Sequence, residues 1–466
     1  MVKILRLKLS CATRKENTGM QILKAKEINK QSILFICMLV FFYLLTFVLF
    51  LLDESLFSFL FFIEALLVLL CCLFVVFSEK KNGFLNPLSF FIISTFFFII
   101  VRPIFYSLSI AENVNEVITA GYSVDKNYLF YSLFVVNICL ALTIFSCLLL
   151  RPLCKSLTVN IYDLYFYNGN VSRFFMLSGV IFTGVFLIKS YSKFILLGDV
   201  SVFEVDKYGL HDDLYWFTFA KYSYIVSLLF AKRKDFIFYS LLIFLASIGY
   251  IMVGLRGYTI SYAFLLLFFL DLRYKLKFRY LLVFAVLVAI VSSLILNYRI
   301  GIEVNRGFWE MIFNPLLQQG ASFETVYGVL KYHSSVLNCI SYYDYFSSIK
   351  DIGSCIDSAR GVYFAEGGSF ATSFYSELIY FGWFIGGIAL LLFSFSLSFI
   401  QSCYDCIVNN KRISANYTYK LILFLSLPNL IYFARSSLFD FSIKLVFVLF
   451  FIILLWFMKK TLVNVN

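Results

Sequence analysis

Long apolar runs separated by short polar stretches make up most of the chain. About a dozen of them reach or approach the roughly 20 residues that a helix needs to cross a hydrocarbon core of about 30 Å. They are Ile33–Leu52, Leu56–Phe77, Leu88–Leu108, Leu129–Leu150, Phe174–Leu197, Leu214–Ala231, Phe236–Gly254, Tyr258–Leu270, Tyr280–Asn297, Thr372–Ile400, Thr418–Arg435 and Leu438–Met458. Because the runs are continuous rather than alternating, they predict helices and not the strands of a barrel. The pattern predicts an all-α, polytopic membrane protein with about 12 transmembrane helices.

Composition and charge narrow the class of protein further. Hydrophobic residues make up 61% of the 466 and charged residues only 14%, against roughly a quarter charged in soluble domains. No soluble fold has enough interior to hide so much apolar surface. The composition therefore excludes a soluble enzyme, a nucleic-acid-binding protein and a disordered protein. The net charge of +12 indicates contact with a lipid bilayer and no nucleic-acid partner.

Lysine and arginine gather in alternate gaps between the predicted helices. Counted from an N-terminus in the cytoplasm, they fill the first tail and the even-numbered gaps, whereas the odd-numbered gaps are poor in lysine and often acidic. This alternation follows the positive-inside rule, so both termini are expected in the cytoplasm. The predicted division is a basic cytoplasmic tail at 1–32, transmembrane helices 1–9 at 33–297, a large periplasmic loop at 298–371, transmembrane helices 10–12 at 372–458 and a cytoplasmic tail at 459–466.

The segment 298–371 is far longer than any other predicted connection. Long loops are usually functional or disordered, and this one holds aromatic residues that can pack. Apolar residues recur at helical spacing over Ala321–Tyr332, which predicts a short helix along the outer face of the bundle. Cys339 and Cys355 both fall in this segment and can form a disulfide if the compartment is oxidising.

Six arginines stand near the predicted outer face, where the positive-inside rule makes them unusual. They are Arg102, Arg256, Arg299, Arg306, Arg360 and Arg435. A guanidinium binds phosphate through two hydrogen bonds and stays charged when partly desolvated, so the set suggests a receptor for a phosphorylated ligand. The alternative is that each one snorkels to lipid headgroups or pairs with a local carboxylate. Arg102, which precedes Pro103, can be purely structural.

Arg256 is the strongest candidate of the six. The apolar run that follows it, Tyr258–Leu270, is about 20 Å long as a helix, which is too short to cross a bilayer. The turn that carries Gly254, Arg256 and Gly257 is therefore expected below the outer surface, inside a cavity. An arginine at membrane depth costs a few kcal/mol and usually marks a ligand path, and the glycines let the backbone approach a phosphate closely.

A late segment of the chain carries the Gly367-Gly368-Ser369 turn, Glu377, Tyr380 and the glycine spacing of Phe381-Gly382 and Gly386, and an earlier run, from Gly254 to Tyr258, holds a glycine-arginine turn. These features resemble those of Wzy-type O-antigen polymerases, which polymerise oligosaccharide repeat units. The plan of about a dozen helices with one large outer loop is similar too. The resemblance implies a GT-C-like membrane fold that acts at the periplasmic face of a bacterial inner membrane.

The resemblance also implies a substrate and a reaction. A growing glycan would move from undecaprenyl pyrophosphate onto a new lipid-linked repeat unit, without a metal or another cofactor, and a separate protein would regulate chain length. Arg256 and Arg299 are the expected catalytic arginines, and the base would be Glu377, His333, Glu324 or Glu366. The expected substrate-binding residues are Arg360, Arg435, Arg306, Gly257, Gly367, Gly368 and Ser369. Glu377 can instead pair with an arginine structurally.

Two other functions share parts of this pattern. An O-antigen ligase passes the finished glycan to a lipid A core and has a similar plan, but the Gly367-Gly368-Ser369 entry favours the polymerase. A lipid-linked oligosaccharide flippase also has many helices and a basic cavity. It should show two related halves and short loops, whereas this chain has no evident internal repeat and one long outer segment.

Overall fold

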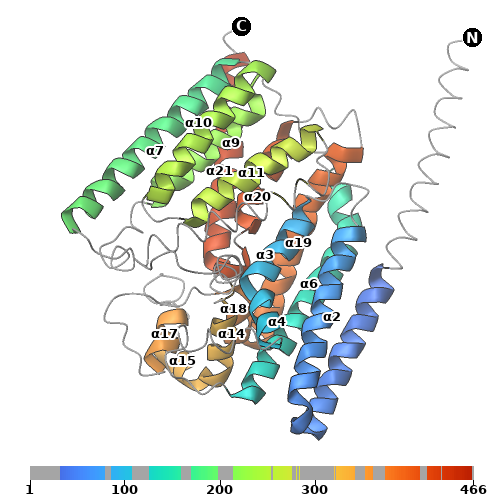
Figure 1. The fold of residues 1–466 in the computed structure, drawn as a ribbon. Coiled ribbons are helices and arrows are strands. Elements are labelled where there is room, and N and C mark those ends of the chain that lie inside the picture. The colour runs from blue at the N-terminus through green and yellow to red at the C-terminus, as the bar shows by residue number, and fades with distance from the viewer. Residues whose placement is uncertain are drawn as a thin grey trace, which may run out of the picture.

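The computed structural model describes most of the predicted helices. The described residues are 32–78, 86–107, 125–158, 169–197, 214–252, 256–274, 280, 283, 320, 322–341, 352–359, 373–409, 417–431 and 433–463. Within these ranges every regular element is a helix. Figure 1 shows them as a bundle of long helices, with the short helices α14, α15, α17 and α18 together at one end.

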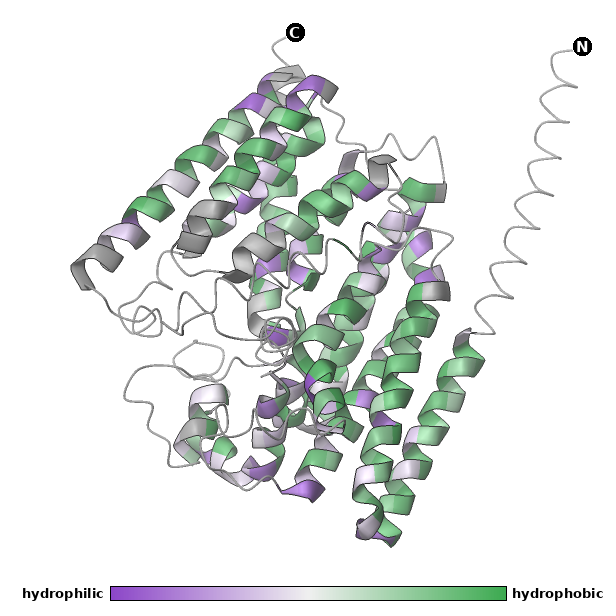
Figure 2. Cartoon of the chain, viewed as in Figure 1, coloured by the Kyte–Doolittle hydropathy of each residue, from purple (hydrophilic) through white to green (hydrophobic). Residues whose placement is uncertain are grey.

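Helices that can cross a membrane account for much of the described chain. Seven are long and apolar enough: Ser32–Leu52, Glu54–Val76, Pro87–Ser107, Lys126–Thr158, Asn170–Lys189, Gly382–Val408 and Phe441–Lys459. Large apolar side chains on their outer faces are exposed, for example Leu52 at 77%. Figure 2 shows apolar residues along nearly the full length of the long helices, with hydrophilic residues toward their ends. The protein is therefore an all-helical, polytopic membrane protein, as the sequence predicts.

The remaining predicted runs also form helices where the structure describes them. The helices in chain order are α2 (Phe57–Ser78), α3 (Pro87–Thr95), α4 (Val101–Ser107), α6 (Lys126–Thr158), α7 (Gly169–Leu197), α9 (Leu214–Phe230), α10 (Arg233–Met252), α11 (Arg256–Tyr274), α19 (Gly382–Asn409), α20 (Tyr417–Ile431) and α21 (Leu438–Val463). The predicted run Tyr280–Asn297 lies outside the described residues, apart from positions 280 and 283.

The helix that contains the eighth predicted run extends beyond the apolar residues Tyr258–Leu270 at both ends. α11 has 19 residues, which is about 28 Å of helix and close to the thickness of a hydrocarbon core. Its described apolar part, Tyr262–Asp271, is nevertheless shorter than a membrane span, and the helix is not among the candidate spans of the described residues. The expected depth of Arg256 stays a prediction.

The third span contains a change of helical pitch. Asn86 caps α3, its side chain accepting from the Ser89 N–H at 2.9 Å, and Pro87 occupies the first turn. After Thr95 the chain forms η3 (Phe96–Ile100), a π-helical turn, and then continues as α4. π-turns inside helices are rare and often lie at functional sites.

The tenth predicted run is two helices and not one. Ser373 caps α18 (Phe374–Tyr380), and the chain turns at Phe381 before α19 begins at Gly382, which has φ of 71°. Only glycine adopts this left-handed conformation without strain. A Cβ at Gly386 would lie 2.5 Å from the carbonyl oxygen of Leu378, so this glycine lets α18 fold back onto α19. The prediction of an unbroken helix over Thr372–Ile400 was wrong because an apolar run contains no signal for a change in φ.

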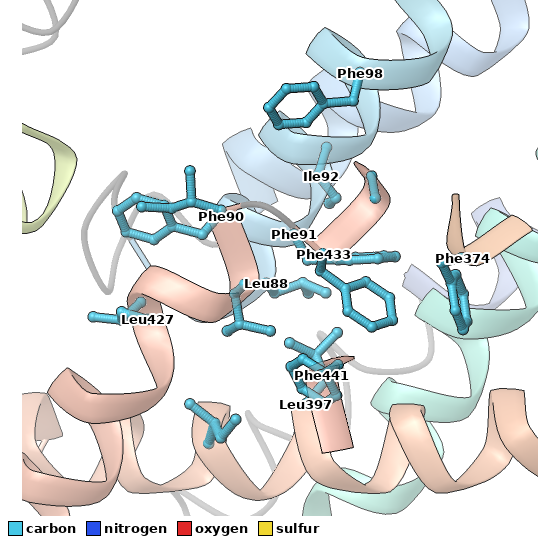
Figure 3. Close-up of a cluster of buried hydrophobic side chains, with 14 of the residues drawn as sticks. Leu88, Phe90, Phe91, Ile92, Phe98, Phe374, Leu397, Leu427, Phe433 and Phe441 are labelled. Atoms are coloured by element: carbon cyan, nitrogen blue, oxygen red, sulfur yellow. The ribbon is translucent and has the colours of Figure 1, made fainter. Parts of the chain in front are cut away.

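A cluster of phenylalanine rings holds several of these elements together. Phe433 of η6 (Phe433–Arg435) stacks on Phe393 of α19 with ring centroids 3.7 Å apart, and it also contacts Phe374, Phe91 and Phe441. Figure 3 shows Phe433 between Phe91, Phe374 and Phe441. Burial of each such side chain stabilises the fold by roughly 1.5–3 kcal/mol. The cluster fixes α18 and η6 against α3, α19 and α21.

A smaller unit forms from the segment between the ninth and tenth predicted spans. The helix predicted over Ala321–Tyr332 is present as α14 (Ser322–Lys331), followed by α15 (His333–Cys339) and α17 (Ile352–Ala359). The disulfide that the sequence leaves open joins Cys339 to Cys355. A separate apolar core lies between this unit and the end of α18: Val329, Val336, Ile340, Ile352, Cys355, Ile356, Tyr380 and Phe381.

Candidate functional site

Four elements that carry predicted site residues meet at the end of the bundle beside this unit. α14 packs against η3, α6, α17 and α18, and η6 packs against α3, η3, α18 and α20. We call the place where α4 with η3, α14, α18 and η6 meet the junction. It brings together residues from the third span, the 298–371 segment and the chain after α20, which lie far apart in the sequence.

An ion pair between Arg102 of α4 and Glu324 of α14 lies inside the junction. Nη2 of Arg102 contacts Oε1 of Glu324, and the two side chains are only 3% and 8% exposed. A Cβ at Gly320 would lie 2.8 Å from the Arg102 Cβ, so a glycine is needed where the chain enters α14. Nη1 of Arg102 is buried and has no hydrogen-bond partner in the described part of the chain. The ion pair with Glu324 therefore gives Arg102 a structural role through Nη2, whereas Nη1 takes no part in it.

A second contact ties α14 to the start of α6. The Tyr327 hydroxyl accepts hydrogen bonds from the Asp125 N–H at 3.1 Å and from Nζ of Lys331 at 3.1 Å. Burial lowers the pKa of Lys331, but this hydrogen bond and the nearby phenols and Asp125 outweigh it, so the net effect raises the pKa. α14 is thus held at both Glu324 and Tyr327.

Arg435 approaches the same π-helical turn from η6. Its side chain is exposed, and its guanidinium carbon lies 5.9 Å from the ring centroid of Phe98, a distance typical of a cation–π contact. Phe98 lies one helical turn before Arg102. Two of the six predicted arginines therefore flank η3.

Glu377 is fully buried on α18. Its Oε2 accepts a hydrogen bond from the backbone N–H of Leu438, the first residue of α21. A carboxylate at a helix N-terminus satisfies a backbone donor and interacts favourably with the helix dipole. This contact favours a role in positioning α18 and α21 over a role as the base.

Another candidate base, His333, lies on a different helix. It is exposed at the first residue of α15, in the disulfide-linked unit. Arg256 and Gly257 are the first two residues of α11. Other predicted site residues lie outside the described residues: Arg299, Arg306, Arg360, Glu366, Gly367, Gly368 and Ser369.

A buried lysine on α9 escaped the sequence reasoning. Lys221 is 5% exposed, its Nζ donates to Oδ1 of Asn429 on α20 at 3.2 Å, and it lies 4.9 Å from the Tyr222 ring centroid. The signal was a single lysine inside the apolar run Leu214–Ala231, since charged residues inside spans usually mark function. α20 contacts α11 and η6, so Lys221 belongs to the helix group that carries Arg256 and Arg435.

A buried carboxyl group was missed in the same way. Glu64 of α2 is fully buried and accepts hydrogen bonds from Thr46 of the Ser32–Leu52 helix and Asn137 of α6. It links three neighbouring helices. Its isolated position in an apolar run was again the available signal.

Another ion pair, partly buried, lies toward the other end of α6. Arg151 of α6 contacts Asp405 of α19 through Nε–Oδ2 at 2.8 Å and Nη2–Oδ1 at 2.9 Å. Gln401 also donates to Oδ1 of Asp405 at 3.2 Å. This two-point geometry is the strong form of the arginine–carboxylate pair.

Possible metal ligands do not cluster in the part of the chain that the structure describes. No group of three or more His, Cys, Asp or Glu side chains that could hold a metal occurs among those residues. The chemistry of the junction is that of arginines, carboxylates and phenols. Such a set binds anions and positions hydroxyl groups.

The fold and the junction define a class: a polytopic membrane protein, helical throughout its described elements, with a buried arginine, Arg102, at one end of its bundle. No family model and no solved structure matches the chain. A protein of Escherichia coli named O-antigen polymerase is 64% identical over 375 residues, which cover 80% of this chain and 84% of that protein. The chain belongs to the O-antigen polymerase family.

Proposed function

We propose that this protein polymerises O-antigen repeat units as a membrane glycosyltransferase. The observation that carries the proposal is the identity of 64% with a protein named O-antigen polymerase, over most of both chains. The multi-pass helical fold supports it, because a polymerase of lipid-linked units acts at a membrane. Neither the ligase nor the flippase is favoured by this comparison.

The donor in this proposal is a glycan carried on undecaprenyl pyrophosphate. A hydroxyl at the non-reducing end of a new lipid-linked unit attacks the anomeric carbon of the growing glycan and loses its proton to a base. The bond from that carbon to the pyrophosphate oxygen breaks, and undecaprenyl pyrophosphate leaves. Arginines neutralise the developing charge without a metal, which is most effective where water is excluded. Arg435 at the junction and Arg256 at the start of α11 are the described candidates.

The proposed topology has about 12 spans, a GT-C-like arrangement, cytoplasmic termini and an active site at the periplasmic face of the inner membrane. Figure 1 supports an even number of crossings, because the start of the Ser32–Leu52 helix and the end of α21 lie on the same side of the molecule. The disulfide between Cys339 and Cys355 supports an oxidising compartment for the 298–371 segment. We further propose that a separate regulator protein sets the chain length.

Deletion and complementation test the function. A strain that lacks a polymerase should carry lipid A core with a single repeat unit, whereas loss of a ligase or flippase leaves core without any unit. Wild-type protein should restore the ladder of long chains. Arg256→Ala should reach the membrane in normal amount and leave single units only, since removal of one group that stabilises a developing anion costs about 10²–10³ in rate. Core without any unit in the deletion strain would contradict the proposal.

A further inference from the structure

Arg102 has more hydrogen-bonding capacity than its ion pair uses. A guanidinium carries five N–H donors, and the contact with Glu324 involves Nη2. Nη1 is buried without a hydrogen-bond partner among the residues described. Leaving a buried charged donor unsatisfied is costly. In a purely structural arginine, Nη1 would therefore be expected to donate to a protein acceptor or to water.

A π-helical turn lies next to Arg102, and the ring centroid of Tyr106 lies 5.9 Å from its guanidinium carbon. The π-helical turn Phe96–Ile100 comes immediately before its helical turn, and such turns recur at functional sites. Arg435 lies over Phe98 in that same turn. One arginine thus reaches η3 from η6 while another follows it in the chain, which concentrates positive charge at one place.

We propose that Arg102 is a further ligand of the lipid diphosphate: its Nη1 donates to a phosphoryl oxygen while Nη2 stays on Glu324. Glu324 fixes the orientation of the guanidinium and reduces the cost of its burial before substrate arrives. The inference rests on the proposed function, because a lipid diphosphate is its ligand. It assigns to Arg102 a role that its place before Pro103 does not suggest.

Two substitutions of one ion pair separate binding from structure. Arg102→Gln and Glu324→Gln remove the same pair, so a structural role predicts equal effects of the two variants on thermal stability and on ligand affinity. The probe is farnesyl pyrophosphate, with farnesyl monophosphate as the comparison, titrated into purified full-length protein in detergent. Arg151→Gln, which opens the pair at the other end of α6, is the matched control.

We expect Arg102→Gln to raise the Kd for farnesyl pyrophosphate at least tenfold and Glu324→Gln to raise it less, because that variant loses only the orientation of the guanidinium. Arg151→Gln should keep the Kd within a factor of three of wild type. The diphosphate should bind wild type more tightly than the monophosphate. Equal weakening by Arg102→Gln and Glu324→Gln, or unchanged affinity in Arg102→Gln, would overturn the assignment. So would absence of diphosphate binding by wild type.

If Arg102→Gln does not fold, Arg102→Lys decides the question. A lysine keeps the charge and can still pair with Glu324, but it has no second planar edge for a phosphate. A wild-type Kd in Arg102→Lys would overturn the proposal, and a clear rise would support it. Polymer formation by wild type from synthetic lipid-linked units is measured separately. Its absence would refute the polymerase itself, whereas polymer with normal binding in the variants would refute only the role of Arg102.

Discussion

Two arginine–carboxylate pairs in the described part of the chain are built differently. Arg151 and Asp405 face each other through two hydrogen bonds of 2.8 and 2.9 Å, with Gln401 as a further donor. Arg102 and Glu324 are joined through one nitrogen, and the second terminal nitrogen of Arg102 has no hydrogen-bond partner in the described ranges. The first pair is closed and the second is open.

The two pairs also lie at opposite ends of α6. α14, which carries Glu324, contacts the start of α6 through Tyr327, whereas Arg151 lies near the end of α6. From its start to Arg151, α6 rises by roughly 38 Å. The closed pair joins two long spans, while the open one joins a span to the unit built from the 298–371 segment. The closed pair serves stability, and the unused donor of Arg102 is the group to which we assign the ligand.

The largest expected difference between the two pairs is in polymer formation. Arg102→Gln should lower long-chain glycan about 100-fold, as loss of a charge-stabilising donor does. Arg151→Gln should leave chain length unchanged and lower stability by about 1–3 kcal/mol, less than a fully buried pair would, because Arg151 is partly exposed. Glycan ladders and thermal unfolding of the two variants measure this. Equal loss of polymer in both would remove the distinction between open and closed pairs.

The second-largest effect is expected from the aromatic packing of η6, which carries Arg435. Phe433→Ala should destabilise the protein by about 3–5 kcal/mol and also lower polymerisation, because Phe433 fixes η6 and with it Arg435. The matched control is Phe175→Ala, since Phe175 is equally buried but lies on α7. It should lose similar stability and keep its activity per folded molecule. A Phe433→Ala protein with normal activity per folded molecule would show that η6 does not position the site.

The disulfide should stabilise only the unit that carries Glu324, and not the region around Arg151. Cys339 and Cys355 should resist alkylation in intact cells until a reductant is added. Replacing both by serine should cost about 3 kcal/mol, the value for a loop of this size, in the local stability of α15 and α17. Limited proteolysis of that unit reports the change. Immediate labelling of both thiols in wild-type cells would exclude the bridge.

The smallest effect is expected at Glu377. Glutamine at this position keeps an oxygen that can accept from the Leu438 N–H, so Glu377→Gln should retain polymerisation within about threefold if the residue only positions α18 and α21. A base at this position would instead lose activity by 10²–10⁴. Initial polymerisation rates distinguish the two roles, and a hundredfold loss would restore Glu377 as the candidate base.

Sequence patterns predicted the parts of this molecule that depend on local physics. Apolar runs located the spans, and helical spacing located α14, because solvent and helix geometry act on neighbouring residues. The shared placement of Cys339 and Cys355 allowed their bridge to be anticipated without deciding it.

The junction could not be predicted in the same way. The break at Gly382 depends on a backbone angle that hydropathy does not encode. The pairing of Arg102 with Glu324 joins residues far apart in the chain, so only the packed structure reveals it. Lys221 carried a readable signal, a cation inside an apolar run, whereas its contact with Asn429 required the fold.

Photo-crosslinking tests the central claim, that the lipid diphosphate binds at the arginines of the junction. A polyprenyl pyrophosphate with a photoreactive group beside the diphosphate would be bound to wild-type protein, irradiated and located by mass spectrometry of the peptides. We predict labels on peptides that contain Arg102 and Arg435, suppressed by excess undecaprenyl pyrophosphate. Labels confined to the other end of α6, around Arg151 and Asp405, would contradict the account.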